Sequence, residues 1–135
     1  MTSKVTYNGE LRTTCIHLRS GNEFITDAPV DNNGLGRAFS PTDTVATGLA
    51  SCMITVMGIK ARDLEVDLTN SVAEVTKHMA SDPRRISKIE IALSLPAHVS
   101  KKNRTILERI GNTCPIHYSL HPDIEKGITY NWIQE

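Results

Sequence analysis

Regular steps between apolar and polar positions predict most of the secondary structure of this chain. Short stretches of alternating or β-branched residues, bounded by turn residues, indicate strands. The Asn8-Gly9 dipeptide predicts a hairpin turn between the first two strands, and Asp82-Pro83 predicts a turn between two later ones. The expected strands are residues 4–7, 13–18, 23–26, 66–79, 86–95 and 128–133.

A long helix is predicted to begin at Ser40, where several start signals coincide. Ser40 is a favourable N-cap residue, Pro41 suits the first helical position, and Asp43 completes a capping box. Apolar residues then recur every three or four positions and form one stripe, so we expect a buried central helix. The stripe consists of Val45, Leu49, Cys52, Val56 and Ile59, widened by Ala46, Met53 and Met57.

Two shorter helical segments are expected in the C-terminal third. Residues 100–111 predict a helix, and Cys114-Pro115 begins a short helical turn. Because strands and helices are grouped rather than strictly alternating, we expect one α+β domain over residues 1–135 with a mostly antiparallel sheet. The residues expected to face inward from the first of these helices are Ile106, Leu107 and Ile110.

Composition and charge narrow the range of partners. The 135 residues carry equal numbers of acidic and basic side chains, no basic run and only 4% aromatic residues, so we expect no nucleic-acid binding. Residues 1–10 are polar and lack the apolar stretch of a secretory signal, and no apolar run is long enough to cross a membrane. We therefore expect a cytoplasmic protein without a membrane partner.

The three cysteines are the chemically distinctive residues. In a cytoplasmic chain we do not expect a disulfide framework, and such cysteines are more often buried, metal-bound or reactive. Cys52, on the apolar stripe, is either an inert core thiol or a reactive one. Cys114 precedes Pro115 as an N-cap residue would, so it is either a turn residue or a thiol that the helix N-terminus ionises. Cys15 lies within a predicted strand, and we interpret it as structural.

A metal site is a competing interpretation. Cys114, His117 and His121 are spaced at i, i+3 and i+7 on one face of a helix, and with Cys52 they could form a tetrahedral zinc site. Pro122 would shorten such a helix, however, and the spacing is not that of a standard zinc finger. The 62 positions between Cys52 and Cys114 carry no motif of their own. The residues alone leave a metal site, a redox pair and inert thiols open.

The segment from Ser40 to Cys52 resembles the signature of the OsmC/Ohr family. It has a Ser-Pro step, an acidic residue, a helix of small and apolar residues, and the small residue Ser51 directly before the cysteine. Cys114-Pro115, which follows a predicted helix, resembles the second cysteine of the family. The opening strands, the glycine-rich loop and the final strand occur in the family's order, so the resemblance covers nearly the whole chain.

The resemblance implies an OsmC-like fold in an intertwined homodimer with active sites at the interface. It implies that Cys52 is the peroxidatic thiol and Cys114 the resolving thiol of an enzyme that reduces organic hydroperoxides in preference to hydrogen peroxide. It implies no metal or flavin cofactor, and electron donors that are dithiols, often lipoyl-linked. The family also stabilises its thiolate with an arginine from the N-terminal strands. The nearest match is Arg12, with Arg19 and Arg37 as alternatives.

One position departs from the hydroperoxide-resistance branch of the family. There the acidic residue directly follows the proline, whereas this chain has Thr42 at that position and the acid at Asp43, so it is closer to the less characterised OsmC-like branch. Asp43 and Cys52 are nine positions apart, which at about 100° per residue places them on opposite sides of one helix. Asp43 would therefore act through an intermediary. The alternative function is a non-catalytic binding protein for a small ligand or a metal.

Overall fold

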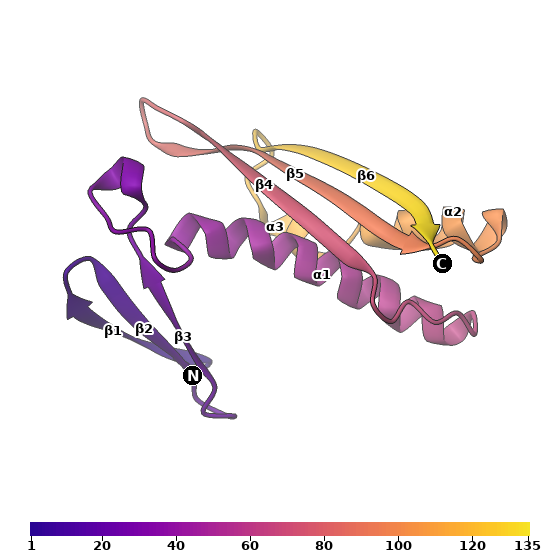
Figure 1. Ribbon diagram of the computed structural model, residues 1–135, viewed down its shortest axis with the longest axis horizontal. Coiled ribbons are helices and arrows are strands. Elements are labelled where there is room, and N and C mark those ends of the chain that lie inside the picture. The colour runs from indigo at the N-terminus through magenta and orange to yellow at the C-terminus, as the bar shows by residue number, and fades with distance from the viewer. The chain divides into compact units, whose positions relative to one another are not determined.

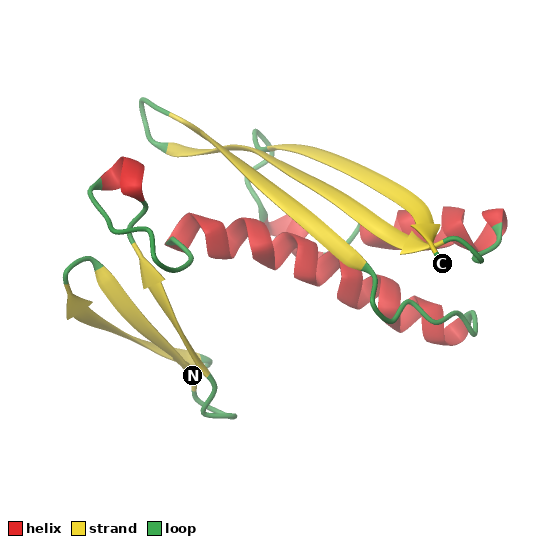
Figure 2. Ribbon diagram, viewed as in Figure 1, coloured by secondary structure: helices red, strands yellow, loops and turns green.

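Two three-stranded sheets, each formed by its own stretch of sequence, contain all the strands in this computed structural model of residues 1–135 (Figure 1). Residues 1–45 and 46–135 form two separate compact units, and each is described by itself. Every predicted strand and helix is present, as the colouring by secondary structure makes plain (Figure 2). The prediction of a single domain over residues 1–135 stays a prediction.

The N-terminal unit is an antiparallel sheet of three strands in the order β1-β2-β3. These strands are β1 (Ser3–Gly9), β2 (Arg12–His17) and β3 (Glu23–Asp27), within two residues of the predicted bounds, and a short 3₁₀ helix, η1 (Val30–Asn32), follows. A hairpin joins β1 to β2 as predicted, but its turn consists of Glu10 and Leu11 rather than Asn8 and Gly9, because Gly9 still pairs with Arg12 at the end of β1. Gly9, Glu10 and Leu11 have φ angles of 82°, 56° and 61°, the left-handed backbone of a tight hairpin.

The N-terminal unit has no apolar core of its own. Its buried residues are all polar, namely Thr26, Asp27 and Ser40. Large apolar side chains are instead exposed on the sheet and in the loop that follows it. A three-stranded sheet normally needs a buried apolar face to be stable. The exposed apolar residues are Val5, Tyr7, Leu11, Leu18, Phe24, Ile25, Val30, Leu35 and Phe39.

The long helix α1 (Pro41–Asp63) begins with the capping box that the sequence predicts. The N–H of Asp43 donates to Ser40 Oγ at 3.1 Å, and the N–H of Ser40 donates to Asp43 Oδ2 at 2.9 Å. Two backbone donors that the helix itself cannot satisfy are thereby paired. The predicted start of the helix is confirmed to the residue.

The buried face of α1 differs from the predicted stripe. Val45 and Ile59, which the stripe includes, are 40% and 61% exposed, and Cys52 and Val56 are only partly buried. Apolar residues surround most of this helix, so their period alone does not select the face that packs. The face that lies against the core carries the three alanines of the helix together with leucine and methionine side chains. The buried residues are Ala46, Leu49, Ala50, Met53, Met57 and Ala61.

Helix α1 is also long and apolar enough, by length and composition, to cross a membrane. This corrects the expectation that no segment meets that criterion. The sequence argument looked for an uninterrupted apolar run, whereas α1 reaches the same hydropathy with Thr, Ser and Gly interspersed. Core helices of water-soluble proteins meet the same criterion, so the finding is weak evidence for a membrane span.

The C-terminal unit is a mixed sheet in the order β4-β5-β6 with helices on one face (Figure 1). Strands β4 (Val72–Ala80) and β5 (Arg85–Pro96) are antiparallel, whereas β5 and β6 (Glu125–Gln134) are parallel. The connection from β5 to β6 contains α2 (Lys101–Gly111) and α3 (Pro115–Ser119). Three of the four strand pairings are therefore antiparallel, as predicted, but they belong to two sheets rather than one.

Strand β4 begins at Val72 rather than at the predicted residue 66. The preceding segment turns, because Asp67 Oδ1 accepts the N–H of Thr69 at 2.8 Å and Asn70 has a φ of 70°. Such a local side-chain hydrogen bond and a left-handed Asn both favour a turn over an extended strand.

The core of the C-terminal unit lies between the sheet and the helices. As the period of two in β5 predicts, alternate residues of that strand are fully buried against α1 and α2. Leu107 of α2 is fully buried, and Ile106 and Ile110 are partly buried. The β5 residues that face the core are Ile89, Ile91, Leu93 and Leu95.

Candidate functional site

The fold of the C-terminal unit brings Cys52 and Cys114 together, although 62 positions separate them in the sequence. Cys52 projects from α1 and is partly exposed, whereas Cys114 precedes α3 and is fully buried in the core. Gly48, one turn before Cys52, lies against Ile116, so the start of α3 packs on this part of α1. Both thiols are free.

Burial raises the pKa of the Cys114 thiol, and the neighbouring Cys52 raises it further through hydrogen-bond and charge interactions. The N–H groups of His117 and Ile116 lower this pKa, but their effect is smaller than that of burial. Cys114 occupies the N-cap position of α3 without a regular capping hydrogen bond. The helix N-terminus therefore does favour the thiolate, but burial outweighs this effect, so the pKa of Cys114 is raised overall and the thiol keeps its proton at neutral pH.

Tyr130 on β6 is a partly buried polar neighbour of Cys114 that the sequence did not single out. Its hydroxyl donates to Asn112 Oδ1 at 2.8 Å and lies 3.3 Å from the carbonyl oxygen of Glu108. Burial raises the pKa of Tyr130, with smaller contributions from Glu108 and Cys114. The phenol therefore stays neutral and ties the end of α2 to the sheet. No sequence motif marks this residue.

Arg12, the nearest match to the family's arginine, is paired with an acid in the N-terminal unit. Its Nε and Nη2 donate to Oδ1 and Oδ2 of Asp27 at 2.7 and 2.8 Å. The Arg12 hydrogen bond, against the opposing effect of burial, holds the pKa of Asp27 below its ordinary value. Arg37 contributes its backbone N–H to Asp27 Oδ2 at 3.2 Å, whereas Arg19 lies exposed in the turn after β2. Sequence reasoning missed Asp27, because no motif surrounds it.

Asp43 is engaged at the start of α1, where its carboxylate accepts the N–H of Ser40. This is the capping role that the sequence pattern predicts. A further contribution of Asp43 to the chemistry stays a prediction.

The ligands of the alternative zinc site do not come together. The structure contains no group of three or more His, Cys, Asp and Glu side chains that could hold a metal ion. The side chain of His121 is 69% exposed and lies beside Asp123, whereas Nε2 of His117 is buried without a hydrogen-bond partner. Burial lowers the pKa of His117, and the nearby Lys126 lowers it further. Helix α3 ends at Ser119, before His121, so the helical spacing on which the alternative depends does not form.

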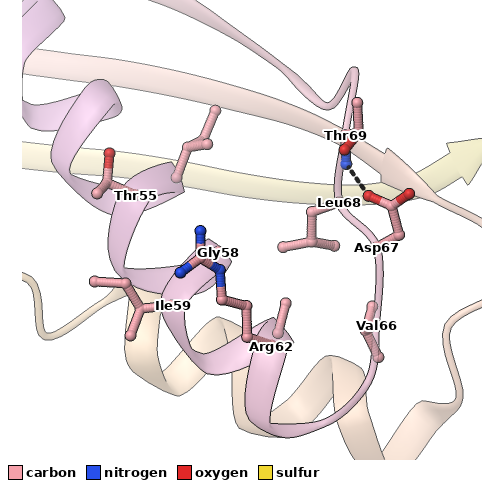
Figure 3. Close-up of a pocket in the computed structure, with 10 residues that line it drawn as sticks. Thr55, Gly58, Ile59, Arg62, Val66, Asp67, Leu68 and Thr69 are labelled. Atoms are coloured by element: carbon pink, nitrogen blue, oxygen red, sulfur yellow. Dashed lines mark hydrogen bonds between the residues drawn. The ribbon is translucent and has the colours of Figure 1, made fainter.

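A pocket of about 390 Å³ lies between the C-terminal half of α1 and the loop of residues 66–69 (Figure 3). Ile59, Val66 and Leu68 contribute apolar walls, and Arg62 and Asp67 stand at its edges. Neither cysteine lines it. The pocket therefore adjoins the exposed apolar residue Ile59 of α1 and is separate from the site of the two thiols.

Comparison with known proteins identifies the family. No curated protein matches the sequence. Residues 33–128 match the family model described as OsmC-like protein. The chain belongs to the OsmC-like family. A crystal structure of an OsmC-like relative from Psychrobacter arcticus 273-4, provisionally assigned to the osmotic stress and detoxification response, is 55% identical over 97% of this chain and 96% of that chain, with a TM-score of 0.94.

More distant OsmC-like structures share the fold. An organic hydroperoxide resistance protein from Elizabethkingia anophelis is 15% identical, covers 97% of this chain and 96% of that chain, and has a TM-score of 0.74. The organic hydroperoxide resistance protein OsmC from Legionella pneumophila is also 15% identical, covers 97% of both chains, and has a TM-score of 0.71. These likenesses show the fold alone. The resemblance to the OsmC/Ohr family inferred from Ser40 to Cys52 is confirmed.

Proposed function

We propose that this OsmC-like chain is a thiol peroxidase that reduces organic hydroperoxides to alcohols, with Cys52 as the peroxidatic thiol and Cys114 as the resolving thiol. The contact between these two free cysteines carries the proposal. Cys52 is partly exposed and reachable by a substrate, and Cys114 is a buried thiol that keeps its proton. Membership of a family that includes organic hydroperoxide resistance proteins supports the choice of substrate.

The proposed reaction has three steps, and atoms and electrons balance in each. The Cys52 thiolate attacks the distal oxygen of the hydroperoxide, the O–O bond breaks, and the alkoxide takes up a proton to leave as an alcohol while Cys52 becomes a sulfenic acid. The sulfur of Cys114 then attacks the sulfenic sulfur, which forms a disulfide and releases water. An external dithiol, which the family resemblance implies is often lipoyl-linked, returns both thiols by exchange.

Arg12 and Asp43 have supporting roles in this proposal. A guanidinium stabilises a thiolate and the negative charge that develops on the peroxide oxygens, and this is the role proposed for Arg12. Asp43 secures the first turn of α1, the helix that carries Cys52. Neither role requires a metal or an organic cofactor.

The proposal includes an intertwined homodimer that buries the apolar surfaces left exposed on a single chain. The N-terminal unit buries no apolar side chain, and α1 leaves Val45 and Ile59 exposed beside an open pocket. A large exposed apolar patch marks an interaction surface. In soluble proteins such a patch is most commonly buried between copies of the same chain in a closed homo-oligomer. A second copy of the chain would make α1 the buried central helix of the assembly. The proposed location stays the cytoplasm, and the zero net charge and low aromatic content support an enzyme without nucleic-acid partners.

The proposal is tested by hydroperoxide consumption in the presence of a dithiol reductant. Wild type should consume tert-butyl hydroperoxide, Cys52→Ser should be reduced to background, and Cys15→Ser is the matched control that should retain wild-type activity. Substantial activity in Cys52→Ser would contradict the assignment of the peroxidatic thiol. An inactive wild type would favour the alternative, a non-catalytic OsmC-like binding protein.

A further inference from the structure

Cys114 lies in the short connection between two helices of the C-terminal unit. This connection, from the end of α2 to the start of α3, consists of Asn112, Thr113 and Cys114. The N–H groups of Asn112 and Thr113 donate to carbonyl oxygens in the last turn of α2, at 3.0 and 3.1 Å. The hydroxyl of Thr113 donates to the same turn. These bonds fasten the connection to α2, but they do not set its distance from the sheet or from α1.

Tyr130 of β6 links the connection to the sheet. Its hydroxyl donates to Oδ1 of Asn112 at 2.8 Å, two residues before Cys114, and lies 3.3 Å from the carbonyl oxygen of Glu108. A phenol carries one proton, so the shorter contact, with Asn112, takes it. The Tyr130 side chain is also close enough to Cys114 for the charges of the two groups to interact. The hydroxyl therefore holds the connection from the side of the sheet.

The Tyr130 hydroxyl fits beneath the end of α2 because the last residue of that helix is Gly111. A Cβ atom at this position would lie 2.6 Å from Oη of Tyr130 and 3.0 Å from the sulfur of Met57. Non-bonded carbon atoms pack at about 3.5 to 4.0 Å, so an added methyl group would drive the hydroxyl away. Met57 belongs to α1, the helix that carries Cys52. Helices α1 and α2 and strand β6 therefore meet at this hydroxyl.

The distance between the two cysteines must lie within narrow limits for a disulfide to form. Bridged cysteines have Cα atoms about 4.4 to 6.8 Å apart. Cys52 and Cys114 are in contact as free thiols, and Cys114 is fully buried. Because a side chain in a packed core has little room to move, the placement of the backbone at Cys114 decides how often the two sulfurs meet.

We propose that Tyr130 is a positioning residue that holds Cys114 in bonding range of Cys52 for the formation of the disulfide. It acts through Asn112, and in this account it touches neither the hydroperoxide nor Cys52. The inference rests on the proposed function, in which Cys114 resolves the oxidised Cys52. Without the hydroxyl, the connection is freer in the reduced protein, and the disulfide must then order it. The effective concentration of Cys114 at Cys52 therefore falls.

The test measures this effective concentration without a peroxide. Reduced wild type and Tyr130→Phe are equilibrated with mixtures of oxidised and reduced dithiothreitol, and peptide mass mapping gives the fraction of chains with a disulfide between Cys52 and Cys114. The exchange oxidises both thiols and reduces the cyclic disulfide of the reagent to its dithiol. Tyr118→Phe is the matched control, because it removes the same atom from a tyrosine of α3 that is 76% exposed.

Gly111→Ala provides a second variant that reaches the same hydroxyl from the other side. Its methyl group should displace the Tyr130 hydroxyl from Asn112, whereas in the Tyr130→Phe background the displaced atom is absent. The two losses should therefore not add. Circular dichroism shows that each variant is folded. A parallel series with tert-butyl hydroperoxide follows the rate at which Cys52 is first oxidised and the yields of disulfide and sulfinic acid.

We expect Tyr130→Phe to lower the equilibrium constant for the disulfide by about fivefold, the scale of one buried hydrogen bond. Gly111→Ala should show a similar loss, and Tyr118→Phe should match wild type. With hydroperoxide, the first oxidation of Cys52 in Tyr130→Phe should keep its wild-type rate, while more of the product proceeds to sulfinic acid. A merely structural role would change the first step as well.

The inference is overturned by an unchanged equilibrium in Tyr130→Phe, by an equal loss in Tyr118→Phe, or by losses from Gly111→Ala and Tyr130→Phe that add. It is also overturned if the first oxidation of Cys52 slows as much as the disulfide equilibrium falls. If the dithiothreitol series shows the expected loss while hydroperoxide modifies no variant, Tyr130 positions Cys114 and only the peroxidase proposal fails. A wild type that forms no disulfide between Cys52 and Cys114 with either reagent overturns both.

Discussion

At the scale of single residues, the two cysteines of the candidate site differ in the property that matters for thiol chemistry. Cys52 is partly exposed, and Cys114 is fully buried with a raised pKa. A thiol whose pKa is raised on folding stabilises the folded state below its unfolded pKa, and this contribution is lost as the pH rises through the folded pKa. Cys114 should therefore make the protein less stable under alkaline conditions.

Cys114→Ala should remove this alkaline loss. Between about pH 8 and about pH 10, a window that begins near the ordinary thiol pKa of about 8.5, we expect the free energy of unfolding of wild type to fall more steeply than that of Cys114→Ala. Urea unfolding at several pH values measures the difference, and Cys15→Ala controls for the loss of one thiol. Parallel pH profiles for wild type and Cys114→Ala would contradict the raised pKa.

The resolving role of Cys114 predicts a second outcome for the same position. In Cys114→Ser, hydroperoxide should still oxidise Cys52, but no intrachain disulfide can form. Turnover with a dithiol should fall towards background and Cys52 should accumulate as sulfinic acid, because a sulfenic acid that lacks a resolving thiol is open to further oxidation. Intact mass after excess hydroperoxide measures this. Full turnover in Cys114→Ser would mean that the external dithiol resolves Cys52 directly.

The segment from Ser40 to Cys52 pointed to Cys52, the Cys114-Pro115 step pointed to Cys114, and the family resemblance suggested Arg12, but the sequence did not reveal the surroundings of these residues. The pKa of Cys114 depends on burial, which a preceding helix and a following proline do not indicate. Asp27 has no motif, since only its pairing in register with Arg12 across two strands distinguishes it. Contacts of this kind exist only once the sheet has formed.

At the scale of elements, α1 shows which features local sequence determines. Its first residue follows from Ser40, Pro41 and Asp43, because a capping box is a contact between neighbours in the chain. Its buried face cannot be predicted from the local sequence, because apolar residues surround the helix. Packing against the sheet decides which of them are buried. The late start of β4 is a local effect, because the turn at Asp67 competes with an extended strand.

Ser40→Ala tests the cap. Ser40 is 1% exposed, and its hydroxyl accepts the N–H of Asp43. Loss of an N-cap serine costs about 1 kcal/mol, and burial of the unpaired N–H adds to that cost, so we expect a loss of about 1 to 2 kcal/mol in the free energy of unfolding. Urea unfolding measures it, with Ser51→Ala at an exposed position of the same helix as the control. Equal stabilities of the two variants would contradict the capping account.

At the scale of the whole molecule, the main feature is the apolar surface that a single chain leaves exposed to water. The exposed apolar residues of the N-terminal unit and the exposed Ile59 of α1 are the surface that the proposed homodimer would bury. The period of two in β5 predicted the core of the C-terminal unit, because that core lies within one chain. The sequence pattern wrongly placed Val45 and Ile59 of α1 in this core, whereas both are exposed.

The dimer predicts that dissociation and unfolding coincide. The unfolding midpoint of wild type should rise with protein concentration, and sedimentation at low micromolar concentration should show only dimer. Ile59→Lys should weaken assembly by placing a charge on the uncovered apolar face, whereas Thr76→Lys, at an exposed position of β4, is the matched control. A folded wild-type monomer, or equal assembly of the two variants, would count against the dimer.

The most direct test of the central claim is the identity of the bond formed when the reduced protein meets one equivalent of organic hydroperoxide. Peptide mass mapping without a reducing agent locates it. The account predicts one alcohol released per chain and a disulfide that joins Cys52 to Cys114 of the same chain, with Cys15 unmodified. A disulfide that includes Cys15, a link between two chains, or thiols that remain free would contradict it.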